Sequence, residues 1–248
     1  GRVRFIGLDN FLSLAEDPAF WYSLRNILAF VLVGVPLNIV TALIIALVLD
    51  HPCRNLKGIS RTLFFLPTVT TLAAVALVWQ RLYAVEGGLL NQICLWAGLP
   101  AINWLNHPWF ALPALIIMTV WKGFGLNAAV FLAALQNVPE ELYEQVEIDG
   151  GSWWHKIRHV TLPFLQGSMV FVFITTTVGT FHVFTEPYMM TGGGPLYATI
   201  TPVLHLYQNG FQFFRLGYAS AITCTLSIGV IAFNLLQQAL RRRWGHTP

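Results

Sequence analysis

The chain has 248 residues, of which 56% are hydrophobic and only 10% are charged, with a formal net charge of +3. An average soluble domain carries about 25% charged residues, so this composition excludes a soluble globular protein. The mean hydropathy of +0.62 agrees with a polytopic membrane protein, and the small net charge predicts no nucleic-acid partner.

Apolar runs of about 20 residues, long enough to cross a bilayer as a helix, occur five times in the sequence. They cover residues 24–49, 62–83, 110–136, 164–190 and 218–240. The runs lack the alternation of membrane β-strands, and helices are the other way to satisfy backbone polar groups in lipid. We therefore expect a single all-α integral membrane domain over residues 1–248, with five spans.

Basic residues are concentrated on one side of this expected bundle. That side carries Arg54, Lys57, Arg61, Lys156, Arg158, Arg241, Arg242 and Arg243, whereas Arg2, Arg4, Arg81 and Arg215 lie opposite. Short cytoplasmic loops are enriched in Lys and Arg, so the C-terminus is expected in the cytoplasm. Residues 1–20 then lie outside without a signal-peptide pattern. We expect a further helix before them; the alternative is a five-helix chain with an outside N-terminus.

The most polar internal segment, residues 137–163, lies between the third and fourth expected spans. Five of the chain's eleven acidic residues fall between Glu140 and Asp149. Asn137 followed by Glu140 forms a capping-box pattern for a first short helix. Gly150 and Gly151 are expected to end it, and Ser152 is expected to cap a second short helix that runs toward Thr161.

This expected helical hairpin carries both apolar and charged side chains. Leu142, Val146, Trp153, Trp154 and Ile157 supply apolar contacts, and charged residues surround them. An apolar patch with acidic flanks fits a groove on another protein. The alternative is an amphipathic segment that lies on lipid, which the acidic residues disfavour because an anionic leaflet repels them.

The segment also carries a known signature. Glu144, Asp149, Gly150, Leu162 and Pro163 match the EAA motif at its usual spacing, and the segment resembles the coupling loop of permease subunits of ABC importers. Gln145 and Val146 replace the first two alanines of that pattern, Gly151 replaces the third, and Ile157 stands where Phe is usual. These departures enlarge the first helix and are expected to loosen the glycine elbow.

The resemblance extends over nearly the whole chain. Segments similar to the carbohydrate-uptake branch of these permeases, which serves maltose-, trehalose-, oligosaccharide- and glycerol-phosphate-type importers, are residues 5–11, 61–67, 88–91, 102–104, 131–136, 191–195 and 216–221. Such family members usually have a helix before the first of these segments, in agreement with the further helix expected above.

This resemblance implies a type I ABC importer transmembrane fold in a bacterial or archaeal cytoplasmic (inner) membrane. The chain would form half of a sugar pathway with a second, homologous permease. Two cytoplasmic ATPase subunits would bind ATP and Mg, and an extracytoplasmic solute-binding protein or lipoprotein would deliver the carbohydrate. The residues implied in ATPase coupling are Glu144, Asp149, Gly150, Gly151, Ile157, Leu162 and Pro163.

Polar and aromatic side chains inside or near the spans are candidate substrate contacts. They are Trp121, Lys122, Asn127, Phe181, Phe184, Glu186 and Tyr188. Lys122 could line a polar sugar path, or pair with a helix-end carbonyl or a carboxylate of a partner subunit. Glu186, with aromatic neighbours that can stack on sugar rings, could bind hydroxyl groups, or be a satisfied carboxylate near the outer membrane boundary.

No catalytic set is visible, and this chain is not expected to be an enzyme or to bind a cofactor. It lacks a phosphate-binding loop of the Gly-x-x-x-x-Gly-Lys-Ser/Thr type. His155 and His159 share one helix face but have no supporting ligands, so no metal site is predicted. Two alternatives remain: a self-sufficient secondary transporter, which would need paired broken helices in two related halves, and a non-transport membrane scaffold.

Overall fold

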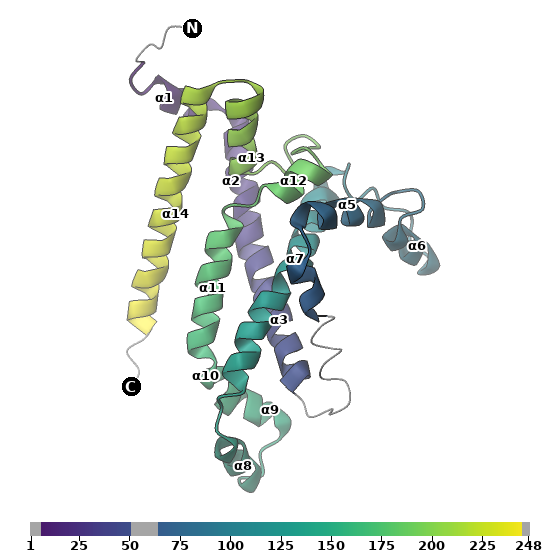
Figure 1. Ribbon diagram of the computed structural model, residues 1–248, viewed down its shortest axis with the longest axis vertical. Helices are drawn as coiled ribbons and strands as arrows, with labels where there is room; N and C mark the ends of the chain where they lie inside the picture. Colours follow the sequence, from purple (N-terminus) through teal and green to yellow (C-terminus); the bar gives the residue numbers. More distant parts are fainter. Residues whose placement is uncertain (1–5, 51–63, 245–248) are drawn as a thin grey trace. The chain divides into compact units, whose positions relative to one another are not determined.

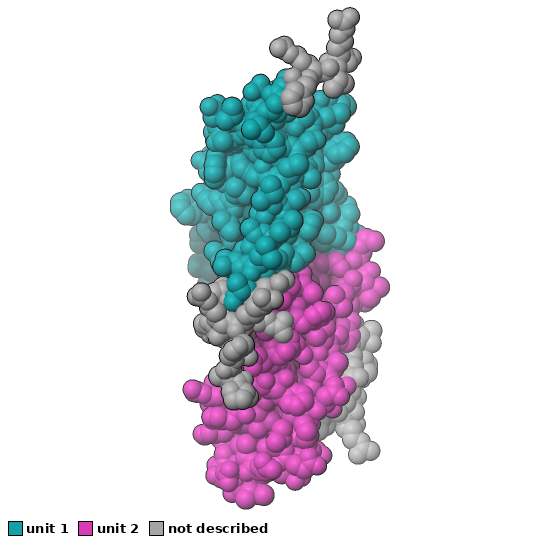
Figure 2. All heavy atoms as spheres, turned by 90° about the vertical axis from the view of Figure 1, so that its left-hand side faces the viewer, with its two compact units in different colours: residues 1–32, 72–118, 178–248 teal, residues 33–71, 119–177 magenta. Residues whose placement is uncertain are grey.

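A computed structural model describes residues 6–50 and 64–244 of the chain, and the elements assigned within these ranges are all helical (Figure 1). The chain divides into two compact units (Figure 2). Unit 1 comprises residues 1–32, 72–118 and 178–248, and unit 2 comprises residues 33–71 and 119–177. The single domain expected over residues 1–248 stays a prediction. The basic residues between the first two expected spans lie outside the described ranges.

The first expected span is part of a continuous apolar helical stretch of 33 residues, Pro18–Asp50. It consists of α2 (Pro18–Ala29), one π-helical turn (η1, Phe30–Gly34) and α3 (Val35–Asp50). The helix begins where it does because the Asp17 carboxylate accepts a hydrogen bond of 2.8 Å from the Ala19 N–H, and proline at the first helical position needs no partner for an N–H.

Two other expected spans are also long helices. α7 (Pro108–Leu135) covers the third with 28 residues, and α14 (Leu216–Trp244) covers the fifth. Within α14, Leu216–Gln237 is apolar enough to cross a membrane. These helices are predominantly apolar around their circumference, as expected of segments surrounded by lipid and other helices.

The second and fourth expected spans are interrupted. Helical residues 64–69 are separated by a break at residues 70–71 from α5 (Leu72–Leu82), which has only 11 residues. The Thr70 hydroxyl donates to the Pro67 carbonyl over 2.8 Å, competing with helical backbone bonding. The described residues contain three helices long and apolar enough to cross a membrane, or four if the bent pair described next counts as one span. The count of five spans stays a prediction.

The fourth expected span is bent and then broken. Residues Trp153–Phe164 meet α11 (Gln166–Thr180) at an angle of 64°. After α11 the chain leaves the helix at residues 181–184 before the short α12 (Thr185–Met190). The N–H groups of His182 and Val183 bond to carbonyls three residues earlier, which tightens the turn and ends the α-helical ladder.

The core of unit 2 lies where α3, α7 and α11 meet. Ala42, Ala46 and Ala128 are fully buried there, and Phe131 and Leu165 fill the space between them. Small residues let membrane helices approach closely. The remaining elements of unit 2 are α8 (Glu140–Ile148), α9 (Trp153–Lys156), a π-helical turn (η2, Ile157–Thr161) and α10 (Leu162–Phe164).

Unit 1 also contains α1 (Asp9–Glu16), α6 (Leu89–Trp96), α13 (Pro202–Tyr207) and a π-helical turn (η3, Gln208–Gln212). Leu14, Phe20 and Ile222 form one of its apolar clusters. Beside this cluster, Asp17 Oδ2 is 2.9 Å from His205 Nε2 and accepts a hydrogen bond of 2.5 Å from the Tyr218 hydroxyl. These contacts connect the start of α2 to α13 and α14.

The ionisation of Asp17 and His205 follows from their surroundings. Burial lowers the pKa of His205 below its ordinary value, and the attraction of the Asp17 carboxylate only partly opposes this effect. Burial would raise the pKa of Asp17, but hydrogen bonds from Tyr218 and from the Ala19 N–H, with the contact to His205, outweigh it and lower the pKa. The contact therefore joins a carboxylate to a neutral imidazole at neutral pH.

Candidate functional site: the loop between α7 and α11

The polar segment forms a helical hairpin at one end of unit 2, where α8 and α9 extend beyond the neighbouring ends of α7 and α10 (Figure 1). α8 begins at Glu140, and Pro139 is its N-cap residue in an extended conformation, without a capping side chain. The predicted capping box of Asn137 and Glu140 is wrong. Asn137 Nδ2 instead donates to the Ala133 carbonyl over 2.7 Å, which satisfies an acceptor at the end of α7.

The predicted glycine elbow is formed as a Schellman motif. The N–H of Gly150 bonds to the Glu147 carbonyl over 2.9 Å, and the N–H of Gly151 bonds to the Val146 carbonyl over 2.8 Å. Gly150 has φ +75°, a conformation that L side chains rarely adopt.

The elbow is closely packed rather than loosened. A Cβ atom at Gly151 would lie 2.5 Å from Val146 Cγ1 and 2.8 Å from the Val146 carbonyl oxygen. Val146 thus occupies the space that the third alanine of the EAA pattern would need. The two departures from that pattern, a larger residue at 146 and a smaller one at 151, compensate each other.

The second helical leg begins at Trp153 with Ser152 as its N-cap residue, as the sequence predicts. Ser152 Oγ is 2.8 Å from His155 Nδ1, and the Ser152 N–H donates to the same nitrogen over 3.3 Å. His159 Nδ1 is 3.1 Å from the His155 carbonyl oxygen. Both histidines therefore contact local groups, and the described part of the chain contains no cluster of three or more metal-ligating side chains.

Two side-chain contacts fix the legs to each other. The Tyr143 hydroxyl on α8 and the Thr161 hydroxyl on η2 are 3.1 Å apart, and Thr161 is buried. Lys156 on α9 forms an ion pair with Glu147 on α8. Together with the elbow, these contacts join α8 to α9 and to η2.

The outer surface of the hairpin combines apolar and acidic groups. Ile148, Trp153 and Trp154 are exposed by 84%, 62% and 60%. The exposed acidic residues Glu144 and Asp149 accompany them. This combination of large uncovered apolar groups with carboxylates is typical of a protein-docking surface.

The predicted coupling residues divide into two groups. Glu144, Asp149, Gly150 and Pro163 are exposed, whereas Gly151, Ile157 and Leu162 are half-buried or buried. Ile157 packs inside unit 2 and positions the second leg. Sequence analysis overlooked Ile148, although an isolated apolar residue among the acidic residues of α8 could have identified it.

Lys122 lies in unit 2 and binds the end of a helix. Its Nζ donates to the carbonyls of Pro67 over 2.6 Å and Thr68 over 3.0 Å, at the C-terminus of the helical residues 64–69. A cation there is favoured by the helix dipole. Of the alternatives for Lys122, this geometry agrees with the helix-end carbonyl.

Asn127 is the centre of a buried polar contact among three helices of unit 2. Its Nδ2 donates to Asn38 Oδ1 on α3 over 2.6 Å and to Thr176 Oγ1 on α11 over 2.9 Å. Asn38 Nδ2 in turn donates to the Val120 carbonyl over 3.3 Å. Trp121, next to Lys122, is 37% exposed.

The other four substrate candidates lie in unit 1. Glu186 and Phe181 are buried, and the ring of Phe181 packs edge-on against Phe233. Phe184 and Tyr188 stack with ring centroids 5.2 Å apart. The structure therefore places Trp121, Lys122 and Asn127 in unit 2 and the other four candidates in unit 1. Among the aromatic candidates, Trp121 and Tyr188 are exposed.

Two further aromatic residues extend the stack. Tyr207 lies 5.1 Å from Phe184 and 5.3 Å from Tyr188 between ring centroids, and Phe211 stacks on Tyr207 at 5.5 Å. We call Phe184, Tyr188, Tyr207 and Phe211 the aromatic cluster. Sequence analysis missed Tyr207 and Phe211. Phe184 and Tyr188 are four residues apart, and so are Tyr207 and Phe211, which is the spacing of neighbours on one helix face.

Comparison with known proteins gives the family. Residues 18–246 match the binding-protein-dependent transport system inner membrane component family. Among curated relatives, the lactose transport system permease protein LacF of Rhizobium radiobacter is 35% identical over 95% of this chain and 80% of its own length. The trehalose/maltose permease MalF of Thermococcus litoralis is 32% identical over 94% of this chain and 78% of its own length.

A solved structure shares the fold. One chain of a bacterial alginate ABC transporter, in complex with its alginate pentasaccharide-bound periplasmic protein, superimposes with a TM-score of 0.85 at 25% identity. The match covers 98% of this chain and 85% of that one. The present chain therefore belongs to the binding-protein-dependent transport permeases. It is a multi-pass inner membrane component of an ABC importer, and not the ATPase.

Proposed function

We propose that this chain forms half of the translocation pathway of a sugar importer, beside a second, similar permease. The support is the identity with permeases named for lactose and for trehalose and maltose. In the proposed assembly, a periplasmic binding protein delivers the sugar and two ATPase subunits, which bind ATP and Mg, drive transport. The C-terminus and the hairpin face the cytoplasm.

The observation that carries the coupling role is the hairpin with an exposed acidic and apolar surface. Ile148, Trp153 and Trp154 would enter a groove of the ATPase, and Glu144 and Asp149 would contact its rim. Buried apolar anchors supply most of the affinity in such interfaces, whereas rim charges chiefly select the partner. Force on the hairpin would reach the membrane helices through Ile157, Leu162 and Pro163.

Co-purification of the ATPase tests this assignment. Trp153→Ser and the charge reversal Glu144→Lys should each abolish or strongly reduce ATPase recovery while membrane insertion is unchanged. Glu86→Lys, at an exposed position of unit 1, is the matched control. Undiminished ATPase recovery with both hairpin variants would exclude the hairpin as the docking element.

We further propose that the sugar contacts the aromatic cluster, and that Lys122 and Asn127 have structural roles. Aromatic faces stack on the apolar faces of sugar rings, and Tyr188 and Phe211 are exposed. Lys122 and Asn127 already bind protein groups. Tyr188→Ala and Tyr207→Ala should reduce sugar uptake by reconstituted importer without loss of ATPase recovery, whereas Trp109→Ala, also exposed, should not.

A further inference from the structure

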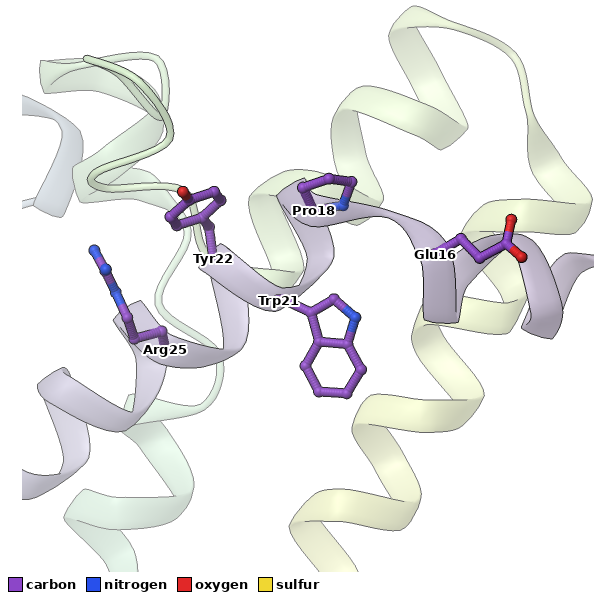
Figure 3. A pocket seen from close by; sticks show the side chains of 5 residues that line it. All are labelled: Glu16, Pro18, Trp21, Tyr22 and Arg25. Atoms are coloured by element: carbon purple, nitrogen blue, oxygen red, sulfur yellow. The ribbon is translucent and has the colours of Figure 1, made fainter.

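Two exposed surfaces of unit 1 contain tryptophan but differ in charge. One is a shallow cavity of about 410 Å³ beside the start of α2, lined by Glu16, Pro18, Trp21, Tyr22 and Arg25 (Figure 3). The other is the short helix α6. The sequence has no Asp, Glu, Lys or Arg between Glu86 and Lys122, so α6 and its flanking loops lack the charged side chains that line the cavity.

The helix α6 carries an apolar face that the rest of the chain does not cover. Leu89, Ile93 and Trp96 recur every three to four residues and so share this face. Each is more than half exposed, and Trp96 is 97% exposed. Asn91 is buried and lies on the opposite side, because successive residues are rotated by about 100° around a helix. We call Leu89, Ile93 and Trp96 the α6 face; it points away from the protein.

The side chain of Asn91 holds α6 in this orientation. Its Nδ2 donates to the Ile102 carbonyl over 2.9 Å, and its Oδ1 accepts hydrogen bonds from the Ile102 N–H over 2.9 Å and from Trp104 Nε1 over 3.1 Å. The Trp104 ring centroid lies 5.7 Å from that of Tyr83, whose hydroxyl donates to the Ala114 carbonyl of α7 over 2.9 Å. Through these contacts α6 is connected to the first part of α7.

The composition of this region favours a lipid surface over water or a protein partner. At about 25% charged residues, the average of soluble domains, residues 87–106 would contain about five charges, and they contain none. Protein interfaces have a polar rim around their apolar centre. Exposed tryptophans are instead typical of the boundary between lipid and water, and a second one, Trp109, is exposed where the apolar helix α7 begins.

From the uncovered α6 face and the absence of charge around it, we propose that α6 lies in the interfacial layer of the membrane. The α6 face is immersed in the leaflet where α7 begins. Leu89 and Ile93 contact acyl chains, and Trp96 lies near the headgroups. Burial of apolar surface drives this immersion, and it needs no anionic lipid because the region offers no cation. Asn91 transmits the depth of α6 to the start of α7.

Spin labels attached to single cysteines test the proposal in the importer, reconstituted with the partners that co-purify with it. The background carries Cys53→Ser, Cys94→Ser and Cys224→Ser. Oxygen concentrates in lipid and a nickel chelate stays in water, so the ratio of their collision rates reports immersion. At positions 93 and 96 this ratio should be severalfold higher than at the exposed Glu86. It should approach the ratio at Ile228, an exposed position in the apolar part of α14.

Two further measurements decide between lipid, water and protein. The collision ratios at positions 93 and 96 should be the same in vesicles with and without phosphatidylglycerol. Benzoylphenylalanine at position 96, which needs no cysteine replacement, should crosslink to lipid. Ratios as low as that at position 86 would place the α6 face in water and overturn the proposal. Crosslinking of position 96 to a second permease or to a binding protein would overturn it in favour of a protein interface, and a ratio that rises with phosphatidylglycerol would contradict apolar burial as its cause.

Discussion

The packing of Val146 against Gly151 makes Gly151→Ala an informative change in the hairpin. Gly→Ala at an allowed backbone conformation ordinarily stabilises a protein by about 0.4–1 kcal/mol. At this position the new Cβ would lie 2.5 Å from Val146 Cγ1 and 2.8 Å from the Val146 carbonyl oxygen, where real Cβ atoms are essentially never found. Overpacking of this kind costs about 1–3 kcal/mol. We expect net destabilisation of the hairpin by about 1–2 kcal/mol.

Val146→Ala should relieve the first of these two contacts. The double variant Val146→Ala/Gly151→Ala also restores alanine at two positions of the EAA pattern. We expect a favourable interaction free energy of about 1 kcal/mol between the two substitutions, within the range of about 0.5–3 kcal/mol measured for residues in contact. Recovery should be incomplete, because the contact with the backbone oxygen of residue 146 persists.

Hydrogen–deuterium exchange of amides 140–160 measures the local opening of the hairpin. Destabilisation by about 1–2 kcal/mol corresponds to exchange about 5–30 times faster. Gly150→Ala is the matched control: it strains the positive φ of Gly150, but its Cβ would have no neighbour within 4 Å. Adding Val146→Ala should therefore slow the accelerated amide exchange of Gly151→Ala, but not that of Gly150→Ala. Equal rescue of both, or unchanged exchange in Gly151→Ala, would refute the packing argument.

Three further predictions concern other contacts. Lys122→Met should lower the unfolding free energy by about 2 kcal/mol, since charged hydrogen bonds contribute about 1.5–3 kcal/mol. It should leave sugar preference in transport assays unchanged. A changed preference would instead place Lys122 in the substrate path. Tyr143→Phe should cost about 1 kcal/mol of hairpin stability, seen as faster amide exchange in residues 153–161, and unaltered exchange would show that the contact with Thr161 contributes nothing. The lowered pKa of His205 means that protons bind the unfolded chain more readily than the folded one, so thermal stability should fall as pH drops below about 6.5. His205→Gln should flatten this pH dependence between pH 7 and 5.5. An unchanged slope in the variant would contradict the prediction.

Composition predicted the long helices because an apolar run reports contact with lipid. The runs at residues 24–49, 110–136 and 218–240 are all long helices in the structure. Apolar composition does not report whether the backbone is continuous. The breaks at residues 70–71 and 181–184 therefore escaped prediction, since local hydrogen bonds that end a helix leave the hydropathy unchanged.

Within the candidate site, features that depend on backbone conformation could be predicted from the sequence. The hydrogen-bond partners of side chains could not. The elbow followed from two adjacent glycines, because few other residues adopt a positive φ. The capping box failed because Asn137 has two possible partners at similar spacing, and it bonds to the preceding helix at Ala133. Lys122 had two interpretations because its partner carbonyls, at Pro67 and Thr68, are distant in sequence.

The hydrogen bonds inside unit 2 bear on how a docking hairpin could act on membrane helices. A polar side chain in an apolar helix is unfavourable unless it is satisfied, and Asn127 is satisfied only while α3, α7 and α11 keep their present arrangement. Lys122 likewise fixes the end of helical residues 64–69 to α7. The hairpin continues directly into α7 and α10, so displacement of the hairpin displaces helices that these contacts hold together. The hydrogen bonds of Lys122 and Asn127 thus join α3, α7, α11 and the end of helical residues 64–69 within unit 2.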